Sequence, residues 1–163
     1  MLTTAALVPA AGRGERLGGG VPKACRPLDG EPMVVHCVRS LLDAVSLVVV
    51  AAPPGKADAL RSWFSRWGKR VVVVDGGATR QESVRLALAV VPAEVDVVLV
   101  HDAARPLAPV RLIQAVVDAV ANGADAVVPA LAVADTVKAM DGSGRVLKTF
   151  DRSELRAIQT PQG

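Results

Sequence analysis

The sequence has almost no aromatic side chains. Its 163 residues include no Tyr, two Trp and two Phe, although 51% of them are apolar. A core built with so few rings must consist of Val, Leu and Ala, which suits buried parallel strands covered by Ala-rich helices. The same lack removes the stacking platforms that single-stranded nucleic acids need. Because the formal net charge is only +3 and the charges are dispersed, we expect no nucleic-acid partner.

Cysteines and long apolar runs are also scarce. Cys25 and Cys37 form neither a disulfide framework nor a metal-binding spacing, which favours a reducing, cytoplasmic location. No stretch approaches the roughly 20 apolar residues of a membrane span, and residues 1–4 carry no basic start of a secretory signal. The sequence therefore predicts one domain over residues 1–163 with no membrane partner.

Apolar runs alternate with segments of helical spacing along most of the chain. The expected strands cover residues 5–9, 46–51, 71–74, 95–100 and 126–130, and the expected helices cover 33–44, 56–67, 81–90 and the stretch from after Pro106 to about 122. In the helix over 56–67, we expect Ala59, Leu60, Trp63 and Trp67 to form the buried stripe. The repetition predicts an α/β fold with a mostly parallel sheet, right-handed crossovers and helices on both faces.

The pattern changes after Ala130. Residues 136–140 and 145–149 flank a Gly-containing turn, which predicts a β-hairpin, and residues 155–160 form a third extended piece. We expect an inserted antiparallel β-arm over about 133–160. Since such an arm exposes strand edges, a second subunit is the expected partner. No terminal helix precedes Gly163, so we also expect the natural protein to continue beyond it.

Three loops follow expected strands, on the sheet edge where parallel α/β proteins bind ligands. The first, residues 9–23, combines Gly12 and Gly14 with the cations Arg16 and Lys23, which predicts a concavity for phosphate oxygens. It matches neither the dinucleotide fingerprint nor the Walker A loop. A solvated surface loop is the alternative interpretation.

The other two loops also allow two interpretations each. The loop over 76–83 pairs two glycines with a helix start, and by itself it is explained by a turn with an N-cap at Thr79 or Ser83. The loop over 101–106 puts Asp102 after an apolar strand, where a carboxylate must be paired or bind a metal. Mg²⁺ needs few protein carboxylates, so one Asp is sufficient. The alternative is an ion pair with Arg105, and we expect His101 and His36 to be structural.

These motifs together resemble one enzyme family over essentially the whole chain. The matching residues, in order, are Pro9-Ala-Ala-Gly12-x-Gly14-x-Arg16, Pro22-Lys23, Arg80-x-x-Ser83, His101-Asp102-Ala-Ala-Arg105-Pro106, Asp135-Thr136, Asp151-Arg152 and Gln159-Thr160-Pro161-Gln162. The family is the 2-C-methyl-D-erythritol 4-phosphate cytidylyltransferases of the non-mevalonate isoprenoid pathway. The resemblance implies a Rossmann-like fold and a homodimer joined by the β-arm. It further implies cytidylyl transfer from CTP to methylerythritol phosphate, with release of pyrophosphate.

The resemblance also implies roles for individual residues. It makes Arg16 and Lys23 the pair that stabilises the transition state, and it places Asp102 beside a Mg²⁺ cofactor. The implied nucleotide-binding residues are Ala10, Ala11, Gly12, Gly14, Gly77, Ser83, Asp102 and Ala103. The implied contacts to methylerythritol phosphate are Arg105, Thr136, Arg152 and Thr160, of which Thr136 and Arg152 serve the neighbouring subunit. Members of the family also carry a second lysine in a segment that would follow Gly163.

Two other functions remain open on the sequence. One is a cytidylyltransferase for another polyol phosphate, such as ribitol 5-phosphate, which the arm residues Thr136, Arg152 and Thr160 would decide. The other is a catalytically silent nucleotide-binding or dimerisation fragment. The presence of Arg16, Lys23 and Asp102 argues against the second.

Overall fold

The structure, a computed structural model, describes residues 2–12 and 21–163. In this part of the chain a four-stranded parallel sheet has the order β5-β4-β1-β6, formed by β1 (Thr4–Pro9), β4 (Leu47–Ala52), β5 (Val71–Asp75) and β6 (Val97–Val100). Each strand lies within about two residues of its expected place. The carboxyl ends of all four strands therefore meet at one edge of the sheet.

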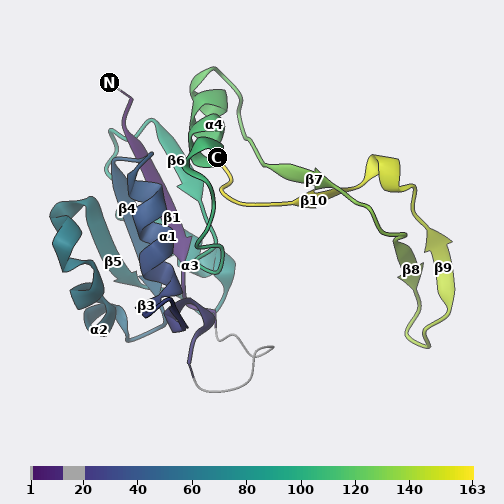
Figure 1. Cartoon of the computed structure of the whole chain (residues 1–163), viewed down its shortest axis with the longest axis horizontal. Helices are drawn as coiled ribbons and strands as arrows, with labels where there is room; N and C mark the ends of the chain where they lie inside the picture. Colours follow the sequence, from purple (N-terminus) through teal and green to yellow (C-terminus); the bar gives the residue numbers. More distant parts are fainter. Residues whose placement is uncertain (1, 13–20) are drawn as a thin grey trace.

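Helices cover both faces of this sheet, as the repetition predicts (Figure 1). On one face, Val8 and Val48 share the larger apolar core with α1 (Met33–Leu42), α2 (Ala57–Arg61) and α4 (Val110–Ala121). On the other face, Leu7 and Val49 pack with Ala87 of α3 (Arg80–Leu88). Neighbouring residues of a strand point to opposite faces, so continuous apolar strands such as β1 and β4 have to be covered on both.

The segment after β4 differs from the expected helix. α2 ends at Arg61 and a 3₁₀ helix, η3 (Ser62–Arg70), follows it. The buried side of this segment runs through Ala57, Leu60 and Phe64, and the expected stripe is wrong at Ala59, which faces solvent within α2. Trp63 and Trp67 are partly buried against the core.

A short connection links the first loop to α1. It consists of the 3₁₀ turn η2 (Lys23–Cys25) and a small antiparallel pair, β2 (Pro27–Leu28) and β3 (Glu31–Pro32). Two positive-φ residues, Asp29 (φ 48°) and Gly30 (φ 80°), make the turn between these strands. The connection thus fixes the backbone at Lys23 relative to α1.

The expected fifth parallel strand over 126–130 is wrong. Next to β6 lies instead the last part of the chain, where Val100 and Gln162 exchange two backbone hydrogen bonds of 2.7 and 2.9 Å. Gly163 makes the same exchange with Val127, at 2.8 and 2.9 Å. Residues far away in the sequence therefore occupy the edge of β6, and residues 126–129 lie one position farther out.

The β-arm projects from one side of the body (Figure 1). β7 (Ala130–Ala132) pairs with β10 (Arg156–Ile158), and farther out β8 (Lys138–Met140) pairs with β9 (Val146–Thr149), while η4 (Arg152–Glu154) makes the return turn. The predicted hairpin and third extended piece are both present. In the described ranges, no helix is both long and apolar enough to cross a bilayer.

Candidate functional site

A cleft of about 1270 Å³ lies at the carboxyl edge of the parallel sheet. Its lining consists of residues 9–12, 22–24, 53–54, 77–80, 83 and 102–105. The loops after β1, β5 and β6 thus converge as expected. Of the predicted site residues, the lining includes Ala10, Ala11, Gly12, Lys23, Gly77, Ser83, Asp102, Ala103 and Arg105.

In its described residues, 9–12 and 21–23, the first loop contributes backbone groups and one cation. Ala10 is buried and its N–H continues the sheet by donating to Ala51 O at 2.8 Å. Lys23 starts η2, where Pro22 and Lys23 accept backbone hydrogen bonds of 2.9 and 3.2 Å from Cys25 and Arg26. Within the described residues no carboxylate pairs with the Lys23 ammonium, so its charge is available to an anion. Gly14 and Arg16 lie outside the described residues.

Gly76 brings the first and second loops into contact. A Cβ atom at this position would lie 2.7 Å from the Ala52 carbonyl oxygen and 2.9 Å from Ala11 Cβ. Only glycine allows two backbones to approach this closely. The paired glycines were visible in the sequence, but the contact that requires the first of them was not.

The second loop is also the capped start of α3. Thr79 Oγ1 accepts from Glu82 N at 3.1 Å, so the N-cap interpretation is confirmed. Ser83 is buried, and its hydroxyl accepts from Gly77 N at 3.1 Å and donates to Thr79 O at 2.9 Å. This hydroxyl therefore holds the backbone of Gly77 at the edge of the cleft.

Asp102 is the carboxylate in the cleft lining, and two guanidinium groups neutralise it. Arg80 donates to Asp102 Oδ1 through Nε at 3.2 Å and Nη2 at 3.0 Å. The ion pair with Arg105, the alternative interpretation of this loop, is also present but longer, with 3.7 Å between Arg105 Nε and Asp102 Oδ2. Arg80 was part of the matched motif, but 22 residues separate it from Asp102 and the sequence assigned it no role.

His101 and Cys37 are structural neighbours of the cleft. His101 is buried, and its Nε2 donates to Arg105 O at 3.1 Å, since a carbonyl can only accept. In the described part of the chain its Nδ1 has no partner. Burial lowers the pKa of His101, so the ring is neutral. Burial, and then the Asp102 carboxylate, raise the pKa of Cys37 to about 12, which leaves an unreactive thiol.

Three predicted contacts to the second substrate lie outside the cleft lining. Thr160 is buried, and its Oγ1 accepts from Asp102 N at 3.3 Å, so it supports the Asp102 loop from behind. Thr136 and Arg152 are exposed on the arm, where Arg152 Nη1 donates to Ala134 O at 2.7 Å. That Thr136 and Arg152 contact the substrate bound by a neighbouring subunit stays a prediction.

A parallel sheet with helices on both faces, and a cleft built from the loops at its carboxyl edge, place the chain in the class of Rossmann-like α/β proteins. Residues 4–163 match the family model "IspD: 2-C-methyl-D-erythritol 4-phosphate cytidylyltransferase". The chain belongs to this family.

Relatives of the same name agree with this assignment. The 2-C-methyl-D-erythritol 4-phosphate cytidylyltransferase of Streptomyces coelicolor is 54% identical over 172 residues, with 98% of this chain and 64% of the relative covered. That of Frankia casuarinae is 56% identical over 161 residues, with 98% and 59% covered. The crystal structure of the Thermus thermophilus enzyme is 34% identical with a TM-score of 0.73, covering 96% of this chain and 67% of that one. The chain thus spans about three-fifths of the length of the first two relatives.

Proposed function

We propose that this chain carries the active site for cytidylyl transfer from CTP to 2-C-methyl-D-erythritol 4-phosphate. The observation that carries the proposal is the convergence of the family's three loop motifs on one cleft. The relatives' own names state the same activity. The cleft's volume exceeds the 300–1,000 Å³ of an ordinary small-molecule pocket, which fits a nucleotide together with a second substrate.

The nucleotide half of the proposal rests on small side chains and backbone groups. Ala10, Ala11 and Gly77 leave room for a base to approach the main chain, and the contact at Gly76 keeps their two loops together. Ser83 fixes the orientation of the Gly77 peptide. A site that reads a base through fixed peptide groups favours one base over another, because a wrong base leaves polar groups unpaired.

The reaction needs positioning and charge stabilisation more than acid–base chemistry. An oxygen of the polyol phosphate attacks the α-phosphorus of CTP, and the bond from that phosphorus to the leaving pyrophosphate oxygen breaks. The attacking phosphate is already ionised near neutral pH, so no general base is required. Lys23, whose ammonium is unpaired among the described residues, is placed to stabilise negative charge on the transferring phosphate. Arg16 is the second residue proposed for this role.

The donor set at the cleft fits a Mg²⁺ ion carried by the nucleotide. Mg²⁺ is usually held by one or two protein carboxylates, with water and substrate phosphates completing its shell. Among the described residues, Asp102 is the carboxylate that lines the cleft. Arg80 donates both of its hydrogen bonds to Oδ1, so Oδ2 is the oxygen that would hold the ion. When bound, Mg²⁺ would draw the triphosphate oxygens together and neutralise part of their charge.

The arm supports the proposal of a homodimer. Apolar side chains on it are exposed, among them Leu131 (61%), Met140 (57%) and Leu147 (66%). A second copy would cover them and would bring Thr136 and Arg152 to the neighbouring cleft. Sedimentation velocity checks this: the chain should sediment as a dimer and a Leu147→Asp variant as a monomer, whereas a monomeric wild type would contradict the proposal.

We also propose a cytoplasmic location. Both cysteines are free thiols, which supports a reducing compartment. Cell fractionation with an antibody to the chain checks this, and recovery in a membrane or periplasmic fraction would contradict it.

Calorimetry with CTP and ATP, each with Mg²⁺, tests the function first. We expect CTP to bind at least about tenfold more tightly than ATP, a difference of about 1.4 kcal/mol. Lys23→Ala should abolish turnover while CTP affinity changes by less than about tenfold. No binding by a folded chain would identify a silent fragment. Turnover with ribitol 5-phosphate in preference to methylerythritol phosphate would identify the other polyol substrate.

A further inference from the structure

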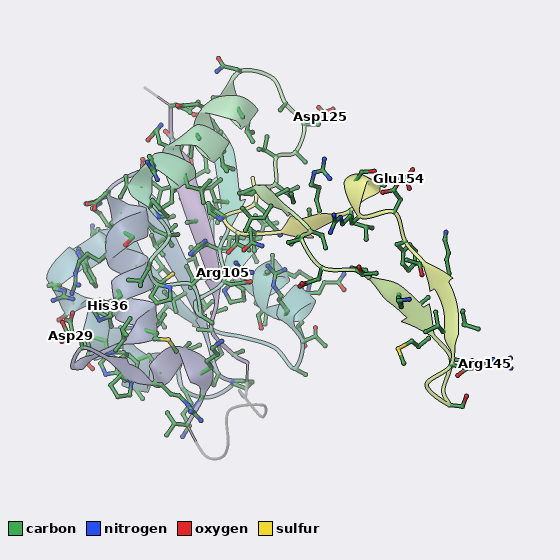
Figure 2. The ribbon with its side chains drawn as sticks, turned by 45° about the vertical axis from the view of Figure 1, so that its right-hand side comes forward. Asp29, His36, Arg105, Asp125, Arg145 and Glu154 are labelled. Carbon is green, nitrogen blue, oxygen red and sulfur yellow. The ribbon has the colours of Figure 1, made fainter. Side chains whose placement is uncertain are left out.

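Residues 159–162, which follow β10 and form the root of the arm, are hydrogen-bonded at three places to the end of β6 and to the loop that carries Asp102 and Arg105. Val100 and Gln162 exchange backbone hydrogen bonds of 2.7 and 2.9 Å. Asp102 N donates to Thr160 Oγ1 at 3.3 Å, and Arg105 Nη1 donates to Gln159 Oε1. Figure 2 shows Arg105 in the body, toward the side from which the arm departs. The root of the arm therefore braces one wall of the cleft.

Gln159 is held so that its amide has one orientation. Its Nε2 donates to Ala157 O at 3.0 Å, and a carbonyl oxygen can only accept. The amide oxygen therefore faces Arg105. The backbone of Gln159 is anchored as well, because its N–H donates to Pro129 O at 2.8 Å and its carbonyl accepts from Gln162 Nε2 at 3.2 Å.

Arg105 lies between two competing acceptors. On one side is the neutral oxygen of Gln159, and on the other is the Asp102 carboxylate, 3.7 Å from Arg105 Nε. Arg80 already donates two hydrogen bonds to Asp102 Oδ1. Without Gln159, the Arg105 guanidinium is free to close fully on Asp102, which would occupy the remaining carboxylate oxygen and change the position of the guanidinium in the cleft.

We propose that Gln159 is a positioning residue, which holds the Arg105 guanidinium apart from Asp102 and so keeps Asp102 Oδ2 open to the cleft. The inference rests on the proposed function and on the contact between Arg105 and the polyol phosphate that the family resemblance implies. Its structural part, a fixed guanidinium, does not need turnover. Gln159 acts through Arg105 and is not itself in the cleft lining.

Two substitutions distinguish the role of the Gln159 amide oxygen, which accepts from Arg105, from that of its amide nitrogen, which donates to Ala157 O. Gln159→Leu removes both hydrogen bonds. Gln159→Glu keeps an acceptor for Arg105 but loses the donor to Ala157 O. Gln162→Leu is the comparison for the backbone, because it removes one of the two hydrogen bonds that anchor the Gln159 main chain and leaves the Gln159 amide and its contact with Arg105 in place.

The first measurement is NMR of the arginine side chains in the whole chain, with Arg105 assigned by Arg105→Lys. We expect separately resolved Nη–H signals of Arg105 in the wild type, in Gln159→Glu and in Gln162→Leu, because a bonded guanidinium rotates slowly. In Gln159→Leu these signals should move to new positions, because the guanidinium then bonds to Asp102 in place of Gln159. Unchanged Arg105 signals in a folded Gln159→Leu protein would overturn the proposal, whether or not the chain is active.

The second measurement is steady-state kinetics. Gln159→Leu should raise the KM for the polyol phosphate by about tenfold, the effect of one charge-assisted hydrogen bond, with CTP affinity within about twofold of the wild type. Gln159→Glu should recover most of that KM, and Gln162→Leu should leave it within about twofold. Equal losses for CTP and polyol phosphate would overturn the positioning role. Failure of the wild type to bind CTP would instead overturn the proposed function, and the NMR result would still decide the role of Gln159.

Discussion

The body and the arm of this chain are held together by different forces. In the body, β1 and β4 are buried almost throughout, with Leu7 at 1% and Val49 at 0% exposure between two helical layers. In the arm, every residue of β7, β9 and β10 is exposed. The body is therefore stabilised by burial of apolar surface, whereas the arm depends on local hydrogen bonds.

Two turns of the arm are stabilised by hydrogen bonds to aspartate side chains and not by a buried core. Asp141 Oδ1 accepts from Ser143 N and Arg145 N, both at 2.9 Å, and Asp151 Oδ1 accepts from Ser153 N at 2.9 Å. Such turns define the path of the chain without burying apolar surface. The arm thus leaves apolar side chains exposed that the proposed partner would cover.

The largest effect should come from truncating one leucine in each region. Leu41 of α1 is fully buried, so Leu41→Ala should cost about 2–5 kcal/mol of unfolding free energy. Leu147 of β9 is 66% exposed in the single chain, so in dilute, monomeric protein Leu147→Ala should change it by less than about 0.5 kcal/mol. Urea denaturation measures both. The proposed dimer predicts a loss at Leu147 that appears only as the protein concentration rises, whereas a loss in dilute protein comparable to that at Leu41 would contradict the comparison.

Two glycine substitutions, one in the body and one in the arm, test the same difference between the two regions. Gly76→Ala should cost about 1–3 kcal/mol, because its Cβ would approach the Ala52 carbonyl oxygen to 2.7 Å and force the loops apart. It should also weaken CTP binding, which calorimetry measures. At Gly142 in the hairpin turn, a Cβ atom would meet no other described residue within 4 Å, so Gly142→Ala is the matched control with a change below about 0.5 kcal/mol. Equal effects would show that the cleft tolerates a wider separation of its loops.

The smallest expected effect is a difference in acid sensitivity. Burial lowers the pKa of His101, so the unfolded chain binds a proton near pH 6.5 while the folded chain does not. The body should therefore be most stable above pH 6.5 and lose stability as the pH falls from there toward the folded pKa of His101. Thermal unfolding between pH 7 and 5 measures this loss, which His101→Gln should reduce. An unchanged acid slope in that variant would contradict the assignment.

The arm should respond to acid in a lower window. Hydrogen bonds from Ser143 and from backbone N–H groups lower the pKa of Asp141, and those from Ser153 lower the pKa of Asp151. Their stabilisation is present above the usual Asp pKa and is lost only as the pH falls through the lowered folded values. Between pH 7 and 5, the amide signals of these two turns should stay unchanged while the body weakens.

Local patterns predicted most of the body, because whether a segment there forms a strand or a helix depends on residues that are close in the sequence. The apolar runs of β1, β4, β5 and β6 and the N-cap at Thr79 are found where they were expected. The pattern failed at Ala59, since the apolar residues of this helix also allow a buried side through Ala57 and Leu60, and packing against the sheet selects that side. It failed again over 126–130, because the chain that lies beside β6 comes from Gln162 and Gly163.

The candidate site likewise has features that local sequence predicts and features that only the tertiary structure fixes. The sequence by itself determined the three loops, the glycines and cations in them and the family to which they belong, because each is a short motif at the end of an apolar strand. Only the tertiary structure decided that Arg80 is the nearer partner of Asp102, that Thr160 supports the Asp102 loop and that Gln159 contacts Arg105. These pairs are 22, 58 and 54 residues apart, and a contact over that distance depends on how the whole sheet and the root of the arm pack together.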